Sequence, residues 1–502
     1  MSLLARGWGS RRAVHAGLLT LAALLLITAR AAAFDPATEA KNFSKIDERE
    51  LNITSKPAYQ TRLAQQNIDG AAEIAEINAT DPERQPANVC ASRQNECAGD
   101  VRFYDWQKDG YGLMHPVLFT ARDGATLSGT VWRTKAGPER RPGVVITTGS
   151  VQAPETMYWG LAATLAKHGY VVLTYDVQGQ GRSDTFGEAP DTQEGVPSQQ
   201  GQPFYDGTED ALRFLLSTKD DPYVPLESCG NANGDTPTSH AEKQDRRVEA
   251  GLNTAYDPFG GMIDRSRIGI AGHSLGAAAV SYIGQEVDKV DAIVAWDNLR
   301  APDSPGAECP ARPDTRRADL PITKPALGMS ADYFLTPTPN TQDPDPQSKN
   351  QGFLAYREAG VDSMQVNIRG GTHYEFSFFA GNTFPYPFGT ATYRGIDLVA
   401  WYTTAWLDRY VKCQGRLACQ RHAERRLLSD RWRHDQPEGA VDPDGDPNMF
   451  SFYFPSRYAF GRVGGDAATC ADMRKGCDSM VADDGRPYSH VRDAREPDSG
   501  GR

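Results

Sequence analysis

Hydrophobic residues in the middle of the chain form short continuous runs that alternate with longer segments of helical spacing. Six such runs predict strands, at residues 143–148, 170–175, 267–271, 291–296, 326–330 and 364–368. Continuous apolar runs of this length are typical of strands that are buried on both faces. The pattern therefore predicts an α/β fold with a mostly parallel central sheet and helices on both faces.

The segments between these runs complete the predicted organisation. Apolar residues at helical spacing predict helices at 154–168, 207–217, 274–285, 353–359 and 396–411. A hairpin is predicted from Pro116–Ala121 and Ala125–Arg133, which flank the turn Arg122-Asp123-Gly124. The predicted main domain spans 113–412, with a polar insertion at about 220–264.

Extensions are predicted on both sides of this domain. Residues 34–112 are polar and irregular apart from a helix-like stretch near 58–77. Residues 413–502 contain cysteines, and the pattern at 448–460 predicts a strand that packs on the main domain.

The first 33 residues have the order of a secretory signal peptide. Three arginines precede an apolar run from Gly17 to Ala29, and Ala31-Ala32-Ala33 forms a small-residue cleavage site before Phe34. The run is short for a membrane span, so a retained anchor is the weaker interpretation. We therefore expect cleavage after Ala33, a secreted protein and no stable membrane insertion afterwards.

Eight cysteines agree with export, because an even number in an exported chain favours disulfides. Cys90/Cys97, Cys413/Cys419 and Cys470/Cys477 are close in sequence, which leaves Cys229 and Cys309 as a long-range pair. Connectivity cannot be fixed from spacing alone. No CxxC spacing occurs, so a zinc site is not expected.

The charge balance narrows the range of partners. The chain has 65 acidic and 53 basic residues and a net charge of −12. A nucleic-acid partner is not expected, because phosphate neutralisation needs clustered Lys and Arg.

The strongest chemical signal is at Ser274. Residues 267–276 read RIGIAGHSLG, which runs from a predicted strand through G-x-S-x-G into an alanine-rich predicted helix. A nucleophilic serine on a sharp strand-to-helix turn requires this context, and Gly272 and Gly276 let the strand and the helix approach. A bare G-x-S-x-G is common, but its placement here predicts that Ser274 is a nucleophile.

A serine nucleophile needs a base and a carboxylate that orients the base. The histidines after Ser274 are His373, His422, His434 and His490, and the last three lie in charged, irregular sequence. His373 ends the segment GGTH that follows a predicted strand. We therefore expect His373 to be the base.

Two aspartates compete to orient that base. Asp332 follows the strand predicted at 326–330, and Asp297 follows the strand predicted at 291–296. Topology favours Asp332, because it stands at the carboxyl end of the penultimate strand. The oxyanion hole is expected to use the backbone N–H of Leu275 and that of Ser150, one residue either way being possible for the latter.

These motifs resemble the α/β-hydrolase superfamily over about residues 115–412. The matching segments are GHSLG at 272–276, Asp332, GGTHYEF at 370–376 and the loop DVQGQGRSD at 176–184. The loop lacks the third glycine of a dinucleotide-binding fingerprint, so no nucleotide cofactor is expected.

A narrower resemblance is to the polyester-hydrolase, cutinase-like and dienelactone-hydrolase branch, including secreted actinobacterial enzymes. It rests on DRSRI at 264–268, on the acidic helix start at 205–212 and on the spacing to His373. The familiar His-Gly before the oxyanion loop is Thr148-Gly149 here, and the insertion and both extensions have no counterpart.

The resemblance implies a secreted serine esterase that uses Ser274, Asp332 and His373 on a small-molecule or polymeric ester. A secreted serine peptidase, such as an aminopeptidase, is the alternative, but the sequence shows no clear carboxylate cluster to recognise a charged terminus. A non-catalytic binding protein is disfavoured because the nucleophile, acid and base occur in the expected order.

Aromatic residues beside the acid and the base suggest where a substrate lies. Tyr333, Phe334 and Tyr374 are predicted to contact an apolar acyl or aryl group. The acidic turn at 442–446 lacks the distal Glu of an EF-hand, so no metal is expected. No cofactor is expected either, and no pattern predicts an oligomeric state.

Overall fold

The structure is a computed structural model, and it describes residues 51–52, 54–85, 100–103, 106, 110–150, 153–196, 201–230, 236–302, 309–312, 316–318, 320–332, 350–368, 371–377, 393–428, 450–451, 454–473 and 477–480. The predicted signal peptide at 1–33 and the cysteines Cys90 and Cys97 lie outside these residues.

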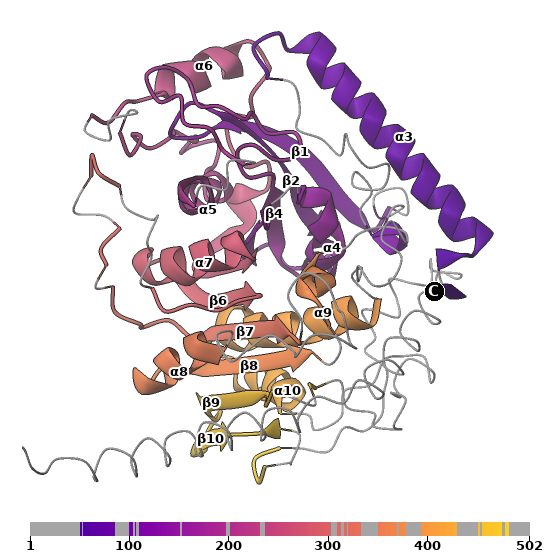
Figure 1. Cartoon of the computed structure of the whole chain (residues 1–502), viewed down its shortest axis with the longest axis vertical. Coiled ribbons are helices and arrows are strands. Elements are labelled where there is room, and N and C mark those ends of the chain that lie inside the picture. The colour runs from indigo at the N-terminus through magenta and orange to yellow at the C-terminus, as the bar shows by residue number, and fades with distance from the viewer. Residues whose placement is uncertain are drawn as a thin grey trace, which may run out of the picture.

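A ten-stranded sheet forms the centre of the described structure, with the order β1-β2-β4-β3-β5-β6-β7-β8-β9-β10 (Figure 1). The strands are β1 Gly112–Thr120, β2 Thr126–Thr134, β3 Arg141–Thr147, β4 Val171–Tyr175, β5 Ile263–His273, β6 Val290–Trp296, β7 Ala326–Ala331, β8 Ser363–Ile368, β9 Arg457–Gly461 and β10 Ala467–Cys470. Strands β4 through β8 in this order run parallel, which confirms the predicted mostly parallel sheet. The outer pairs β1–β2 and β9–β10 run antiparallel.

Helices cover both faces of the sheet. On one face lie α4 (Trp159–Lys167), α9 (Tyr393–Leu407) and α10 (Leu417–Leu427), and on the other lie α5 (Gln202–Leu215), α7 (Leu275–Glu286) and α8 (Gln351–Glu358) (Figure 1). Strand β3 shows why its sequence is continuously apolar. Val144 and Ile146 belong to the core under α4 and α9, whereas Val145 belongs to the core under α5 and α7. Successive side chains of a strand point to opposite faces, so both sets must be hydrophobic.

The N-terminal helix α3 (Pro57–Thr80) runs along the outside of the sheet on the β1 side (Figure 1). It corresponds to the helix-like stretch predicted near 58–77. Ion pairs tie it and the turn after it to the main body: Glu73 to Arg182, Asp81 to Arg247 and Arg84 to Asp184. The described part of the N-terminal extension is therefore docked on the main body.

The C-terminal segment extends the sheet. Strand β9 pairs antiparallel with β8, so the strand predicted within 448–460 does pack on the main body, although β9 begins only at Arg457. Phe450 forms an isolated bridge to Ile368 at the end of β8. The insertion predicted at about 220–264 contains α6 (Ala241–Glu249), and β5 begins at Ile263.

Disulfides join Cys229 to Cys309, Cys413 to Cys419 and Cys470 to Cys477. These pairs confirm the groupings read from spacing for the cysteines that the structure describes. Within the same residues, no helix is long and apolar enough to cross a membrane.

Candidate active site

The carboxyl ends of the parallel strands meet at one edge of the sheet, where loops carry polar side chains. Ser274 directly follows β5, Asp297 directly follows β6, and Asp332 directly follows β7. His373 begins a short 3₁₀ helix, His373–Phe376, after β8. Loop residues at this edge of a parallel sheet commonly form binding and catalytic sites.

Ser274 occupies a strained backbone position between β5 and α7. Its φ is 58° and its ψ is −118°, which a non-glycine residue rarely adopts. A Cβ at Gly272 would lie 2.3 Å from the Gly276 carbonyl oxygen, and a Cβ at Gly276 would lie 2.4 Å from the Thr148 carbonyl oxygen. Both glycines are therefore needed for the strand, the helix and the loop after β3 to approach. Ser274 itself is half-buried and keeps some exposure to solvent.

His373 is held by a carboxylate. Its ring Nδ1 lies 2.5 Å from Oδ2 of Asp297, and both side chains are largely buried. The hydroxyl of Thr372 accepts a hydrogen bond from the Tyr374 N–H and caps the short helix in which His373 lies. A carboxylate on Nδ1 fixes the ring orientation and leaves Nε2 to exchange a proton.

The expected partner of His373 was Asp332, but in the structure it is Asp297 whose Oδ2 lies against Nδ1 of the His373 ring. Asp332 is fully buried one residue beyond β7. The position of the histidine backbone explains the difference, because the carbonyl oxygen of His373 lies 2.9 Å from Nε2 of His273 at the end of β5. This contact draws the loop over β5 and its neighbour β6, where Asp297 lies, and β7 is one strand further away.

Asp297 also has a left-handed backbone, with a φ of 43°. Aspartate tolerates this region better than most residues do. Its N–H donates to the carbonyl oxygen of Met329 at 2.8 Å, and the Ser274 N–H donates to that of Trp296 at 2.9 Å. The two turns are therefore linked through the end of β6.

Ser274 and His373 lie on loops that meet at this edge of the sheet. His273, the residue before Ser274, connects them, because its ring packs against that of His373 with centroids 4.6 Å apart. In substrate-free enzymes the hydrogen bond between a nucleophile and its base is often long.

Two backbone N–H groups were predicted to form an oxyanion hole. The N–H of Leu275 is the first of α7, so it has no acceptor inside the helix. Ser150 lies in the loop after β3, and this loop lies against Ser274, because a Cβ at Gly149 would lie 3.3 Å from Cβ of Ser274. Both Leu275 and Ser150 are half-buried. Their shared role stays a prediction.

Of the three aromatic residues predicted to contact substrate, one lies within the described residues. Tyr374 is half-buried, and its ring meets that of His373 edge to face with centroids 6.4 Å apart. Tyr333 and Phe334 lie outside the described residues.

Two residues near Ser274, Tyr158 and His273, were not singled out from the sequence. Tyr158 lies just before α4, and its hydroxyl is 2.7 Å from Nδ1 of His273 and accepts the Gly149 N–H at 3.0 Å. His273 occupies the variable position of G-x-S-x-G, where it was read only as part of the motif. The histidine directly before Ser274 was the one sequence feature that could have pointed to His273 as a residue of the site.

The loop at 176–184, singled out by the resemblance, has a structural role in the described residues. The Asp176 carboxylate accepts the N–H groups of Glu155 at 2.7 Å and Arg182 at 2.8 Å. Burial raises the pKa of Asp176 to about 6 and that of Glu155 to about 8. At Gly181, with a φ of 49°, a Cβ would collide with the Asp176 carboxylate at 2.3 Å. The loop is therefore closed around this carboxylate.

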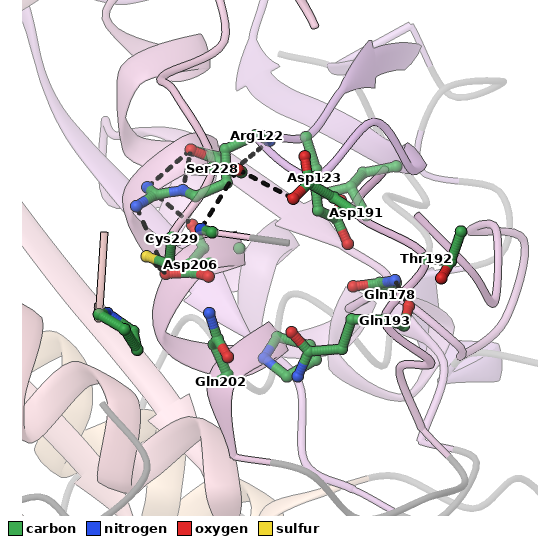
Figure 2. Close-up of a pocket in the computed structure, with 17 residues that line it drawn as sticks. Arg122, Asp123, Gln178, Asp191, Thr192, Gln193, Gln202, Asp206, Ser228 and Cys229 are labelled. Carbon is green, nitrogen blue, oxygen red and sulfur yellow. Dashed lines mark hydrogen bonds and ion pairs between the residues drawn. The ribbon is translucent and has the colours of Figure 1, made fainter. Parts of the chain in front are cut away.

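A polar cavity of about 420 Å³ lies elsewhere along this edge (Figure 2). Its walls come from the β1–β2 turn, the loop after β4, the start of α5 and the segment around the Cys229–Cys309 disulfide. Arg122, Asp206 and Cys229 lie on one side of it, and Gln178 and Gln193 lie on the other. Neither Ser274 nor His373 lines this cavity.

Four aspartates lie in the cavity wall: Asp123, Asp191, Asp206 and Asp210. The Arg122 guanidinium pairs with Asp210 at 2.7 Å and with Asp206 at 3.4 Å. The Asp123 carboxyl has its pKa raised to about 7, chiefly by burial and further by Asp206, Asp210 and Asp191. No group of three or more His, Cys, Asp or Glu suited to a metal occurs within the described residues.

The chain was compared with protein families, curated proteins and solved structures. No family model and no curated protein match the chain. Among solved structures it is similar to a ferulic acid esterase from Streptomyces cinnamoneus, with 17% sequence identity and a TM-score of 0.38. That match covers 60% of this chain and 90% of the esterase chain.

Proposed function

We propose that this chain is a serine hydrolase of the α/β-hydrolase type that cleaves carboxylic esters through an acyl-serine intermediate. The observation that carries the proposal is the strained Ser274 turn at the strand edge that also holds the His373–Asp297 pair. A left-handed serine between a buried strand and a helix is the geometry of a nucleophile elbow. The paired histidine supplies the base that the serine hydroxyl needs.

Each group has a defined step in this reaction. The Ser274 hydroxyl oxygen attacks the ester carbonyl carbon while its proton moves to Nε2 of His373. The N–H groups of Leu275 and Ser150 stabilise the oxyanion that forms. The Asp297 carboxylate, which is hydrogen-bonded to Nδ1 of His373, stabilises the resulting imidazolium. The imidazolium then protonates the leaving alcohol. Water, activated by the same ring, releases the carboxylic acid and regenerates the serine.

Kinetics on p-nitrophenyl esters of increasing acyl length test the proposal. Wild-type chain beginning at Phe34 is compared with Ser274→Ala and His373→Ala. Each variant is expected to lose at least about a thousandfold in kcat/KM, because the nucleophile and its base act as one unit. A wild-type chain that is inert toward every ester, or variants that retain its activity, would contradict the proposal.

A serine peptidase that acts at free amino termini is the second candidate. The carboxylates around the cavity, among them Asp123 and Asp206, favour it because a protonated amine could pair with them. Ester hydrolysis ranks first because neither Ser274 nor His373 lines that cavity. Faster turnover of amino-acid anilides than of p-nitrophenyl esters would reverse this order.

Export to an oxidising environment is part of the same proposal. Disulfides persist in secreted proteins and are rare in reducing compartments, and the described residues contain three of them. The charged, apolar and small-residue order at 1–33 is consistent with this route. Mass spectrometry of protein recovered from culture medium is expected to show a mature chain that begins at Phe34.

A further inference from the structure

A continuous set of hydrogen bonds connects the loop after β3 to the loop that carries His373. It runs from the Gly149 N–H to the Tyr158 hydroxyl at 3.0 Å, then to Nδ1 of His273 at 2.7 Å. From Nε2 of His273 it reaches the backbone carbonyl oxygen of His373 at 2.9 Å. The set therefore touches both sides of the Ser274 turn.

When the His273 ring is neutral, its partners fix the direction of the hydrogen bonds at both ring nitrogens. A carbonyl oxygen can only accept, so Nε2 of His273 carries a proton and donates to His373. In the neutral ring, Nδ1 is then the acceptor, and the Tyr158 hydroxyl donates to it. The Tyr158 oxygen in turn accepts the Gly149 N–H. Burial raises the pKa of Tyr158 well above its usual value, which keeps the phenol protonated.

Packing leaves these groups little freedom. Tyr158 is fully buried and His273 is nearly so. The Tyr158 ring stacks on Trp296 at 6.3 Å between centroids, with planes 8° apart. A Cβ at Gly149 would lie 2.9 Å from Nδ1 of His273 and 3.2 Å from the Tyr158 oxygen, so the loop is pressed against both side chains.

We propose that Tyr158 and His273 are positioning residues that hold the oxyanion loop and the base at a fixed separation around Ser274. This inference rests on the proposed function. Gly149 precedes Ser150, whose N–H is the proposed second oxyanion donor, and His373 is the proposed base. A displacement of either group by about 1 Å can cost about a hundredfold in rate, so one network that fixes both controls kcat.

The first test removes one hydroxyl. Tyr158→Phe keeps the ring against Trp296 and deletes the acceptor for Gly149 and the donor to His273. Its kcat is expected to fall by about tenfold to a hundredfold, with KM changed by less than about threefold, because transition-state groups are displaced and substrate contacts are kept. Tyr356→Phe is the matched control, because the buried Tyr356 hydroxyl on α8 accepts a hydrogen bond from the Gln285 side chain. The kcat of this variant is expected to stay at the wild-type value.

The second test varies His273. The amide of His273→Gln can still donate to the His373 carbonyl, whereas His273→Leu cannot, so activity is expected to fall in the order wild type, Gln, Leu. Tyr158→Phe combined with His273→Leu is expected to lose no more than the worse single variant, because the two residues act in series. Stability of every variant is measured in urea, so that loss of fold is separated from loss of kcat.

A third readout does not depend on activity. Long-range ¹⁵N–¹H spectra are expected to show His273 protonated at Nε2, with its Nδ1 resonance shifted in Tyr158→Phe. The opposite tautomer, or a Tyr158→Phe enzyme with the kcat of Tyr356→Phe, would overturn the positioning role while ester hydrolysis by the wild type stood. A wild type that neither hydrolyses esters nor reacts with a fluorophosphonate would overturn the positioning role together with the proposed function.

Discussion

At the scale of single residues, two left-handed backbones determine which side chains face each other at the strand ends. Ser274 and Asp297 have φ values of 58° and 43°, and each follows its strand directly. The turn at Asp297 presents its carboxylate to Nδ1 of His373. Asp332 follows β7, the next strand in the sheet, and is fully buried.

Replacing each aspartate separately tests this assignment. Asp297→Asn is expected to lower kcat by about a thousandfold to ten-thousandfold, because the ring loses the carboxylate that fixes its tautomer and stabilises its charge. Asp332→Asn is expected to cost less than about tenfold. Steady-state kinetics on one p-nitrophenyl ester measures both. A larger loss for Asp332→Asn would return the acid role to that residue.

The sequence predicted Ser274 and His373 because each signal is local: a strand–turn–helix motif and a glycine-rich loop after a strand. The choice between Asp297 and Asp332 depends on how far the His373 loop reaches across the sheet. That reach is set by the bond from His273 to the His373 carbonyl, a contact between residues a hundred positions apart. No local pattern in the sequence encodes it.

The Asp257 carboxyl is buried, and no charged partner faces it within the part of the chain that the structure describes. Burial raises its pKa to about 8 from an ordinary value of 3.8, and only the Phe259 N–H, donating to Oδ1 at 2.8 Å, opposes this. The pKa of Asp257 is higher in the folded state than in the unfolded state. Its protonated carboxyl therefore contributes fully to the free energy of unfolding below about pH 4. This contribution is lost progressively as the pH rises toward 8.

Asp257→Asn removes this titration and keeps the acceptor for the Phe259 N–H. The free energy of unfolding, measured in urea from pH 5 to pH 8, is expected to fall less steeply with pH in the variant. The difference in slope should reach about 1 kcal/mol per pH unit in the middle of this range. Parallel pH curves for the two proteins would mean that Asp257 is ionised in the folded state.

At the scale of elements, the site depends on three segments meeting closely: β5, α7 and the loop after β3. Gly276 is where α7 approaches the end of β3 and the loop after it, because a Cβ there would lie 2.4 Å from the Thr148 carbonyl oxygen and 2.7 Å from that of Thr147. Backbone atoms cannot move aside as a flexible side chain can. The loop that carries Ser150 would have to shift.

Gly276→Ala is therefore expected to lower kcat/KM by about a hundredfold, since the proposed oxyanion donors leave their positions. Gly261→Ala is the matched control, because a Cβ at Gly261 meets no atom within 4 Å. Kinetics and urea unfolding of both variants measure the effect. Equal activity in the two variants would show that the loop tolerates the extra atom and that its position is less critical than proposed.

Elements with strong periodicity were predicted well, and those held by contacts with the main body were not. The hairpin around Arg122-Asp123-Gly124 and the parallel strands agree with the sequence pattern to within a few residues. Helices α6 and α10 are rich in charged residues, and neither was predicted from the sequence. Strand β10 is short and alternates between exposed and buried positions at the sheet edge. Their partners, and not their own patterns, specify these elements.

At the scale of the whole molecule, the N-terminal segment is fastened to the sheet by buried charges. Nε of Arg84 lies 2.9 Å from Oδ1 of Asp184, with both side chains almost fully buried. The other oxygen of Asp184 accepts the Thr126 N–H at the start of β2. The docking of α3 is thus coupled to the closed loop at 176–184 and to the hairpin.

Arg84→Met removes one partner of this buried pair and is expected to lower the free energy of unfolding by about 3 kcal/mol, because Asp184 keeps a buried charge. Arg246→Met is the matched control. It pairs with Glu83 near the same helix end, but both side chains are about half exposed, and a loss below about 1 kcal/mol is expected. Equal losses in urea unfolding would show that the Arg84 pair does not fasten the segment.

The central claim is that Ser274 is an activated nucleophile, and covalent labelling tests it most directly. The wild-type chain is treated with a fluorophosphonate, digested and mapped by mass spectrometry, with Ser274→Ala alongside. The prediction is one adduct, on Ser274, none in Ser274→Ala, and slower labelling in His373→Ala because the serine loses its base. An unlabelled wild type, or an adduct that persists in Ser274→Ala, would contradict the claim.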